Sequence, residues 1–396
     1  MKRRVSFRTA LCLMLAASCA TALVLIIILK INGLLVTGNA TKWFEKLSEI
    51  DHLTGKHYYW EMDDDSLEDS IADGYMRGLG DPYAEYSDGD DTQDHTLSNR
   101  GKSVGIGVTV VYDEEEDGLY VYRVDPYAPA ADAGLLEKDI ILGADGLTVA
   151  QDGAKTVYDA IDGEEGTSVE LLIKRDGAQQ QLCVERRQYE LTTAHYRLIG
   201  DIGYIDIERF NDLTDDQIIE AIEDMRAKGA QGIVFDVRNC GGGVVDPTAD
   251  ILDYLLPEGN IISATYVNGK TQVLHTSDAN ELDMPMAVLT SGSTASAAEL
   301  FAAAIRDYGK GVLIGTKTYG KGVMQHTYYL SDGSSVKFTV AEFLPPSGVC
   351  FDGVGLEPDI EVTLSDSEAK NFYKLTDEQD PQLTAAVNYL HEQAAK

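Results

Sequence analysis

The sequence predicts a multidomain α/β protein with an N-terminal transmembrane helix, a small β domain, and an α/β sandwich core with helical segments before and after. Three observations predict this fold class. An apolar run of membrane-spanning length fills residues 9–29, short strand-like runs separated by turns fill residues 104–189, and strands alternate with helices from residue 195 onward. The length of 396 residues and the hydrophobic content of 44% suit several globular domains.

Residues 1–36 are predicted to form a cytoplasmic N-terminus and a single transmembrane anchor. Lys2, Arg3, Arg4 and Arg8 precede the apolar run, and the first 30 residues hold no acid. Basic residues on that side place the N-terminus in the cytoplasm and the remainder outside. A cleaved signal peptide is the alternative, but the apolar run continues through LVLIIIL beyond the small-residue patch AASCA. We therefore expect a single-pass protein of the cell membrane whose main part lies on the extracytoplasmic side.

The next segment, residues 37–100, is predicted to be helical and acidic, because KWFEKLSEI and SLEDSIADGYMRGL carry apolar residues at helical spacing. Residues 101–190 form the small β domain. Residues 191–364 form the α/β core, in which the runs IGYIDIERF, GIVFDVRN, PMAVLTSG and GVLIGT are strands between helical stretches. Residues 365–396 are again helical.

The charge and the cysteines exclude several kinds of partner. A net charge of −34 argues against nucleic acid and anionic lipid head groups. The acidic stretches MDDDSLED, SDGDDTQD and YDEEEDG lack the spacing of calcium loops and are expected to be solvated loops. No HExxH or CxxC pattern occurs, so we expect no metal and no other cofactor.

Three cysteines, Cys183, Cys240 and Cys350, follow the predicted anchor. Because their number is odd, free thiols are expected, and one disulfide between two of them is the alternative.

Two residues between positions 291 and 325 are candidates for chemistry. Ser296 stands immediately before the apolar helix AAELFAAAIRD, where backbone N–H groups and the helix dipole favour an oxyanion. Lys321 follows a predicted strand and lies between two glycines in YGKGVMQ. A lysine can deprotonate a serine only while neutral, which requires burial. The plainer alternatives are a helix N-cap for Ser296 and a solvated surface charge for Lys321.

Several motifs, in order, resemble those of the carboxyl-terminal processing peptidases, also called tail-specific proteases. They are GDPYAEY, GIGV, APAADAGLLEKDII, DVRNCGGG, GSTASAAE, GTKTYGKGVMQ, GVGLEPDIEV and DPQLTAAVNYL. The family consists of Ser-Lys serine peptidases that carry a PDZ domain, and the resemblance covers nearly the whole chain after the anchor. It implies that Ser296 is the nucleophile, that Lys321 is the base, and that Gln325 orients the lysine by a hydrogen bond. Thr294 and Ala298 replace two other serines of the family's S-A-S-A-S-E pattern, which leaves the nucleophile intact.

The resemblance also implies two binding elements. An N–H group of Gly242 or Gly243 is expected to join that of Ala297 in an oxyanion hole, although the glycine run alone could be only a tight turn. The GIGV motif resembles the loop with which PDZ domains bind a peptide carboxylate, and its residues are Gly105, Ile106, Gly107 and Val108. Lys138 stands where the PDZ pattern usually has glycine.

The implied function is a membrane-anchored serine endopeptidase that binds exposed C-terminal tails of unfolded proteins in its PDZ domain and cleaves them through an acyl-enzyme. A catalytically silent PDZ adaptor that keeps the peptidase fold is the main alternative. An acyl-group enzyme on a similar sheet is a weaker one, because no coenzyme site is evident. Assembly into a homo-oligomer stays open.

Overall fold

The computed structural model describes residues 14, 16–18, 20–21, 24 and 40–394. Most of the predicted membrane anchor, residues 9–29, lies outside these positions. Among the residues described, no helix combines the length and the apolar character needed to cross a bilayer. The chain divides into two compact units, residues 1–68 and 69–396, and each is considered by itself.

The N-terminal region contains the helices that the sequence predicts, together with two further elements. The predicted helices are α2 (Ala40–His57) and α3 (Asp64–Arg77), which crosses the boundary between the units. A short strand, β1 (Glu85–Ser87), and a helix, α4 (Gly89–Asn99), follow. The prediction that SDGDDTQD is a loop was wrong, because Asp88 caps α4 by accepting a hydrogen bond of 2.9 Å from the Asp91 N–H.

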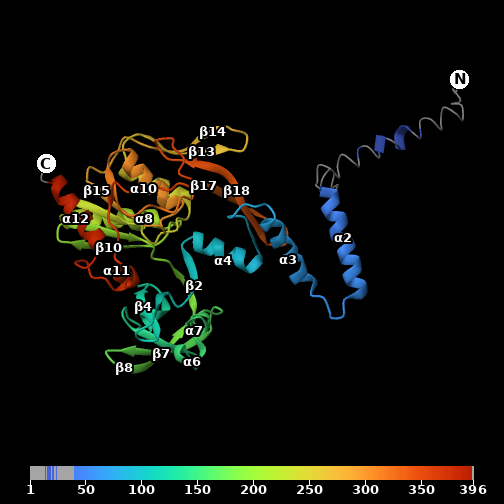
Figure 1. The fold of residues 1–396 in the computed structure, drawn as a ribbon, viewed down its shortest axis with the longest axis horizontal. Coiled ribbons are helices and arrows are strands. Elements are labelled where there is room, and N and C mark those ends of the chain that lie inside the picture. The colour runs from blue at the N-terminus through green and yellow to red at the C-terminus, as the bar shows by residue number, and fades with distance from the viewer. Residues whose placement is uncertain (1–13, 15, 19, 22–23, 25–39, 395–396) are drawn as a thin grey trace, which may run out of the picture. The chain divides into compact units, whose positions relative to one another are not determined.

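A small antiparallel β domain follows α4 (Figure 1). Its main sheet has the order β3-β4-β5-β7-β8, with β6 paired to β5, so that β3 lies at an edge. The strands are β2 (Lys102–Gly105), β3 (Val108–Asp113), β4 (Gly118–Val124), β5 (Ile140–Ala144), β6 (Leu147–Thr148), β7 (Ser168–Arg175), β8 (Ala178–Glu185) and β9 (Arg187–Glu190). The helices are α5 (Pro129–Asp132), α6 (Val149–Asp152) and α7 (Ala154–Ile161). Val121, Leu171 and Ile173 are fully buried in its separate core.

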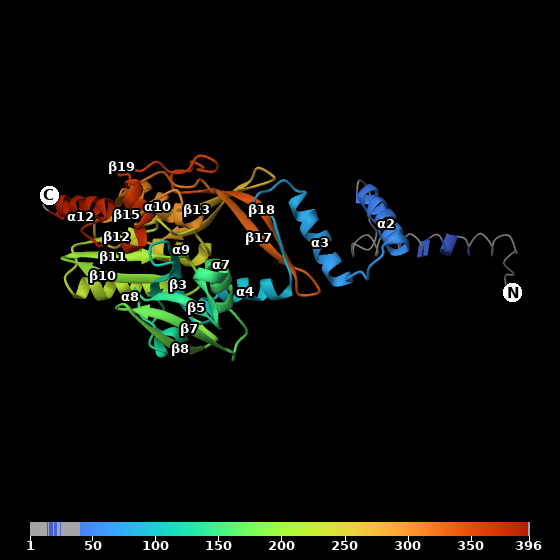
Figure 2. The same ribbon diagram turned by 60° about the horizontal axis from the view of Figure 1, so that its bottom comes forward.

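The larger domain is built on a six-stranded sheet of order β10-β11-β12-β15-β16-β19, parallel except for β10. Its strands are β10 (Ala194–Ile199), β11 (Ile202–Ile207), β12 (Gly232–Asp236), β15 (Met286–Thr290), β16 (Gly311–Gly315) and β19 (Ile360–Glu361). Helices α8 (Thr214–Ala227), α9 (Val245–Leu255) and α10 (Ala297–Asp307) share the core on one face. Helix α12 (Pro381–Ala394) covers the other face (Figure 2). Burial on both faces explains the continuous apolar strands.

A second sheet, which the sequence did not predict as a separate layer, has the order β1-β18-β13-β14, with β17 also paired to β18. Its remaining strands are β13 (Gly259–Tyr266), β14 (Thr271–Ser277), β17 (Val323–Tyr329) and β18 (Ser335–Leu344). The hairpin of β17 and β18 directly follows the glycine-flanked lysine. This sheet therefore ties the N-terminal strand β1 to the segment that carries Lys321 and Gln325.

The C-terminal segment and the small β domain meet the larger domain within the second unit. The segment contains α11 (Asp366–Lys370) and the 3₁₀ turn Phe372–Lys374 before α12. Lys374 forms an ion pair of 2.6 Å with Asp113 of β3. Arg123 of β4 pairs with Asp206 of β11 at 2.7 Å and with Glu208, just after β11 in the six-stranded sheet.

The cysteines in the described part of the chain are all unpaired, so the open alternative of one disulfide is not realised. Cys240 is completely buried, and burial raises the pKa of its thiol to about 12. Since a thiolate is the reactive form, we assign Cys240 a packing role.

Candidate active site

Ser296 lies at a strained turn between strand β15 and helix α10. Its φ of 59° and ψ of −120° lie outside the regions that residues with side chains adopt freely. Such a backbone persists only where its surroundings hold it, and a nucleophile on a sharp strand-to-helix turn is a recurring arrangement in hydrolases. Ser296 lines a cleft of about 830 Å³. The structure thus places this residue where the sequence predicted it, at the start of a buried helix.

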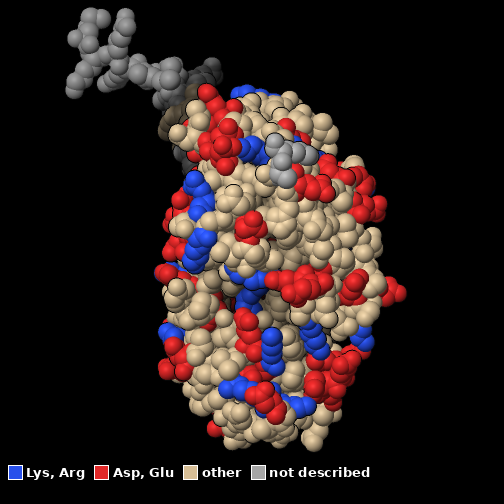
Figure 3. All heavy atoms as spheres, turned by 90° about the vertical axis from the view of Figure 1, so that its left-hand side faces the viewer, with Lys and Arg blue, Asp and Glu red and all other residues tan. Residues whose placement is uncertain are grey.

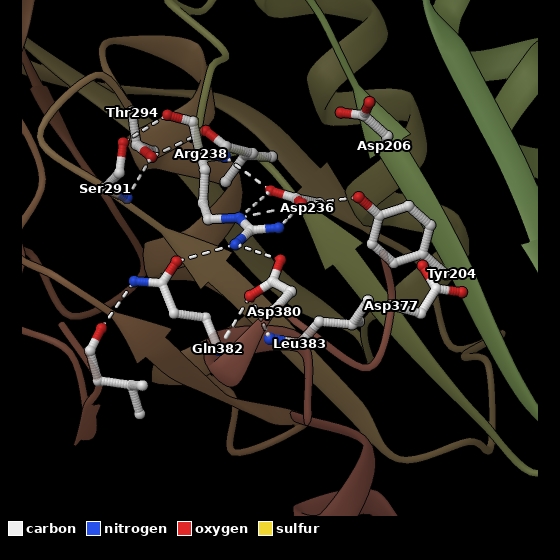
Figure 4. Close-up of polar contacts among 12 residues, drawn as sticks. Tyr204, Asp206, Asp236, Arg238, Ser291, Thr294, Asp377, Asp380, Gln382 and Leu383 are labelled. Carbon is white, nitrogen blue, oxygen red and sulfur yellow. Dashed lines mark hydrogen bonds and ion pairs between the residues drawn. The ribbon is translucent and has the colours of Figure 1, made fainter. Parts of the chain in front are cut away.

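The neighbouring hydroxyl groups have structural roles instead. Ser291 donates its hydroxyl to the backbone oxygen of Arg238, and Thr294 donates its hydroxyl to the backbone oxygen of Val237 at 2.8 Å. Both bonds fasten the turn before Ser296 to the end of β12 (Figure 4). The Ser291 hydroxyl is therefore engaged in a structural bond, which fits the prediction of Ser296 as the nucleophile, a choice that the sequence made from position alone.

Glu299 joins the turn at Ser296 to the loop that carries Lys321. Its side chain is completely buried, and its Oε2 accepts hydrogen bonds from the N–H groups of Ser296 at 2.9 Å and Lys321 at 2.8 Å. Its Oε1 accepts from the Thr318 hydroxyl at 2.5 Å and the Gly320 N–H at 2.8 Å. Four donors on one carboxylate satisfy a buried charge that would otherwise be costly. The sequence used Glu299 only to align the motif, so this role was missed.

The glycines beside Lys321 allow its loop to pack closely on the segment around Gly355. At Gly320, whose φ is +91°, a Cβ would lie 2.8 Å from the Gly355 nitrogen. At Gly322 a Cβ would lie 2.5 Å from the Asp352 nitrogen. Side chains at either position would push the loop outward, so the glycines fix where the Lys321 backbone lies.

The Lys321 amine is half-buried and has no carboxylate within ion-pair distance among the residues described. Its Nζ lies 4.5 Å from the centre of the Tyr83 ring. Burial lowers the pKa of Lys321 below its ordinary value; nearby Lys337 acts in the same direction, while Asp81 and Glu85 oppose it. The environment therefore favours the neutral amine that a base requires.

The two rival lysines are accounted for by ion pairs. Lys317 pairs with Glu357 at 2.8 Å, and Lys310 pairs with Glu281 at 3.0 Å. Each of these two amines is thus engaged with a carboxylate, whereas Lys321 has no such partner among the described residues.

Gln325 lines the same cleft as Ser296 and Lys321, but its side chain makes other bonds than the expected one. Its Nε2 donates to the Thr339 hydroxyl at 3.1 Å and to the Val323 backbone oxygen at 3.3 Å. A β-bulge lies between Met324 and Gln325, which changes the direction of the side chains along β17. The hydrogen bond from Gln325 to Lys321 thus does not occur in this arrangement.

The expected oxyanion residues come together beside Ser296. A Cβ on Gly242, whose φ is +97°, would lie 2.9 Å from the Ala297 nitrogen and 2.9 Å from the Ser296 Cβ. Gly243 packs even more closely, because a Cβ there would meet the Phe210 oxygen at 2.0 Å. Within the described part of the chain, the N–H groups of Gly242 and Ala297 have no backbone acceptor. Two free donors beside Ser296 fit the geometry of an oxyanion hole.

A buried ionic cluster braces the loop that leads to these glycines (Figure 4). Arg238 pairs with Asp236 at 2.5 Å and with Asp380 at 2.8 Å, and donates to the Gln382 side chain at 2.9 Å. These carboxylates raise the pKa of Arg238, and Arg238 in turn lowers the pKa of Asp236. Since Gln382 lies on α12, the cluster joins the C-terminal helix to the glycine loop through the sheet.

The GIGV segment forms a tight connection at the start of strand β3. Gly107 has a φ of +75°, and a Cβ there would meet the Ala128 Cβ at 2.0 Å. The Ile106 oxygen accepts a hydrogen bond of 2.9 Å from the Ala130 N–H. In the part of the chain that the structure describes, no backbone acceptor faces the N–H groups of Ile106 and Gly107. Ile106 and Gly107 thus have open donors, whereas Gly105 and Val108 lie in paired strands. Peptide binding by Gly105 to Val108 stays a prediction.

Lys138, which replaces the usual glycine of this motif, adopts a φ of 74°. The replacement therefore keeps the left-handed backbone that glycine favours, at the cost of local strain.

Comparison with known proteins agrees with this geometry. The model for peptidase family S41 matches residues 201–362, and the model for the PDZ domain matches residues 104–185. A Staphylococcus aureus (strain MSSA476) protein described as a CtpA-like serine protease is 29% identical over 336 residues, or 84% of this chain and 67% of that protein. A similarly described Staphylococcus epidermidis protein is 29% identical over 330 residues, or 83% of this chain and 67% of that protein. A solved Bacteroides fragilis structure described as an S41 protease shares the fold, with a TM-score of 0.60 and 18% identity over 85% of this chain and 99% of that chain.

Proposed function

We propose that this chain, a C-terminal processing serine protease of peptidase family S41 with a PDZ domain, is a Ser-Lys endopeptidase. It would cleave proteins that are presented by their C-terminal tails. One observation carries the proposal. Ser296 and Lys321 line the same cleft, and their backbones are held by the same buried carboxylate of Glu299. A nucleophile and an unpaired, half-buried amine in a shared cleft are what serine-lysine hydrolysis requires.

The proposed reaction uses the neutral amine of Lys321 as the base. Lys321 accepts the hydroxyl proton of Ser296 while Oγ attacks the scissile carbonyl, and the N–H groups of Gly242 and Ala297 stabilise the oxyanion. Collapse of the intermediate breaks the C–N bond, and Lys321 returns the proton to the leaving amine. Water, deprotonated by the same amine, then hydrolyses the ester and restores Ser296. In this scheme Gln325 positions the amine after its side chain turns from Thr339 toward Lys321.

Capture of the substrate is assigned to the PDZ domain. The open N–H groups at Ile106 and Gly107 would receive a terminal carboxylate, and the free edge of β3 would pair with the residues before it. Unfolded or tail-exposed proteins are the substrates that such an extended binding mode admits.

The place of action proposed for this peptidase is the outer side of a membrane, with one N-terminal helix as the anchor. The support is the apolar run at residues 9–29 and the basic residues before it. The test is protease digestion of intact cells that produce the full chain with a tag at either end. Loss of the C-terminal tag alone supports this orientation, and protection of both tags contradicts it.

The catalytic proposal is tested with the full chain in detergent and an unfolded reporter protein. Ser296→Ala and Lys321→Ala should each reduce cleavage by on the order of 10³-fold or more while reporter binding persists. Equal proteolysis by the unmutated chain and both variants would contradict the proposed Ser-Lys mechanism. Binding without cleavage by the unmutated chain would instead support the adaptor that the sequence left as an alternative.

A further inference from the structure

Arg209 lines the catalytic cleft together with Ser296. It follows strand β11, and the next residue, Phe210, pairs with the glycine loop. The Phe210 N–H donates to the Gly242 oxygen at 3.0 Å, and the Phe210 oxygen accepts from the Val244 N–H at 2.9 Å. Arg209 is thereby held beside the proposed oxyanion hole by backbone bonds that do not involve its own side chain.

The guanidinium of Arg209 is only partly satisfied. Its Nη1 donates to the Ser98 hydroxyl at 2.5 Å, whereas its Nε is buried without any acceptor. Among the described residues, no carboxylate lies within ion-pair distance of Arg209. Burial without such a partner lowers the pKa of Arg209. A half-buried cation with a buried, unmet donor is costly, and native structures rarely keep one without a reason.

The other charged side chains of the cleft do not relieve this cation. The carboxylate of Glu208 is taken by Arg123, and that of Asp246 lies 3.2 Å from the imidazole of His275. Lys337 is paired with Glu85. In a chain with a net charge of −34, the cleft leaves Lys321 and Arg209 without acidic partners.

Another arginine of this protein shows what the Nε and Nη2 edge of the Arg209 guanidinium can bind. Arg175 binds Asp139 through Nε at 2.7 Å and Nη2 at 2.5 Å, in a two-pronged contact. In Arg209 the same edge holds no protein acceptor. A carboxylate that enters the cleft would reach Nη2 first, and the covered Nε would take its second oxygen after a small shift of the side chain.

We propose that Arg209 binds a substrate carboxylate in the catalytic cleft, so that this peptidase prefers a negatively charged group close to the scissile bond. The inference rests on the proposed peptidase function. The carboxylate can come from an aspartate or glutamate side chain or from a free chain terminus, because both present the same two oxygens. Arginine discriminates strongly for such a group, since an uncharged substrate would leave its buried donor unpaired.

The test uses peptides that span a cleavage site mapped in the unfolded reporter, in pairs that differ only by glutamate or glutamine near the scissile bond. A second pair differs only by a free or an amidated C-terminus. The full chain should cleave the charged member of at least one pair with a kcat/KM about tenfold higher or more. Arg209→Gln should bring that ratio close to one, and Arg209→Lys, which keeps the charge, should retain part of it.

The controls separate recognition from folding. Arg226→Gln removes an exposed arginine paired with Glu223 and should leave the ratio unchanged. Ser98→Ala removes the one hydroxyl bonded to Arg209 but keeps the guanidinium, so the ratio should persist. The free terminus can also bind the PDZ domain, and therefore an effect of amidation counts only if Arg209→Gln abolishes it. Thermal unfolding of each variant shows whether it is folded.

The outcomes distinguish this inference from the proposed function. Cleavage without a charge preference, or a preference that survives Arg209→Gln, overturns the role of Arg209 and leaves the peptidase intact. Peptide binding is therefore also measured by fluorescence anisotropy in Ser296→Ala. If no peptide is cleaved but the charged peptides still bind more tightly through Arg209, carboxylate binding by Arg209 is supported and the proposed peptidase function is contradicted.

Discussion

The polar groups around the cleft belong to two regions that differ in how fully their hydrogen-bonding capacity is used. The bracing region consists of Asp236, Arg238, Glu299, Asp380 and Gln382. There, Arg238 has three side-chain partners and Glu299 accepts four hydrogen bonds. The open region consists of Arg209, Gly242, Ser296 and Lys321, whose reactive or cationic groups lack such partners among the described residues. Full pairing in one region holds the unpaired groups of the other in place.

The contrast is sharper because acidic side chains are plentiful elsewhere. On the face shown in Figure 3 they form several separate clusters with basic side chains among them. Arg197, at the surface, pairs with Asp377, whereas Arg209 in the cleft pairs with no acid in the described part of the chain. The lack of an acidic partner for Arg209 therefore reflects its position in the cleft and not a shortage of acidic residues in the chain. This is expected where a ligand supplies the missing partner.

Removal of the amine in the open region should have the largest effect. Lys321→Ala should lower kcat by on the order of 10³-fold or more, because the other lysine that lines the cleft, Lys337, is paired with Glu85. The matched control is Lys317→Ala, which removes a nearby exposed lysine paired with Glu357 and should leave kcat unchanged. Cleavage assays on the reporter measure both. A comparable loss in the two variants would contradict the assignment of Lys321.

Disruption of the bracing region should lower stability more than any exposed ion pair does. Arg238→Met leaves Asp236 and Asp380 buried without their partner, and should cost about 3–5 kcal/mol. Arg197→Met removes an exposed pair with Asp377 and should cost about 0–1 kcal/mol. Thermal and denaturant unfolding compare the two. Equal loss would mean that the buried cluster does not brace the fold.

The sequence predicted those parts of the site that lie within one short motif. The sequence indicated Ser296 and Lys321 because a serine before an apolar helix and a lysine between glycines are local patterns. The structure brings both residues to one cleft, and their catalytic roles stay predictions. The role of Glu299 was missed because it joins two segments, the turn at Ser296 and the loop from Thr318 to Lys321, that meet only in the folded chain. Arg238 likewise depends on Gln382, which comes from the far end of the sequence.

Other differences have equally physical causes. The bond expected from Gln325 to Lys321 depends on side-chain direction, and the β-bulge before Gln325 changes that direction. The acidic stretch that begins at Ser87 was taken for a solvated loop, but Asp88 accepts a hydrogen bond from the Asp91 N–H and caps the helix that follows. The sequence did not indicate a role for Arg209, because the residues that surround an arginine, and so its lack of an acidic partner, are set by the folded chain.

A smaller effect on both regions is expected from Glu299→Gln, which keeps the size of the side chain and removes its charge. In either orientation the new amide faces at least one backbone N–H that then lacks an acceptor, at Gly320 or at Ser296 and Lys321. The cost should be about 1–3 kcal/mol in the free energy of unfolding, with a fall in kcat because the Lys321 loop loosens. Unfolding and cleavage assays together check it. Loss of stability without any change in kcat would separate the bracing contacts from catalysis.

The smallest expected effect concerns Tyr83, which covers the Lys321 amine. The rate should rise with pH as Lys321 loses its proton, with a midpoint below the ordinary lysine pKa because burial destabilises the ammonium. Tyr83→Ala admits water to the amine and should move this midpoint to higher pH, because the ammonium is then better solvated. Tyr83→Phe keeps the ring and should leave the midpoint in place. The pH profile of kcat/KM measures both.

The direction of this shift decides which property of the ring matters. An aromatic face also attracts an ammonium group, and that attraction alone would raise the pKa of Lys321, so its removal would move the midpoint to lower pH. Exclusion of water is the larger of the two effects, because burial dominates the lowering of the pKa of Lys321. Lys337, Asp81 and Glu85 are the charged groups that also act on the amine, and they are the same in every variant. A shift to lower pH in Tyr83→Ala would therefore mean that Tyr83 stabilises the protonated resting form instead of preparing the base.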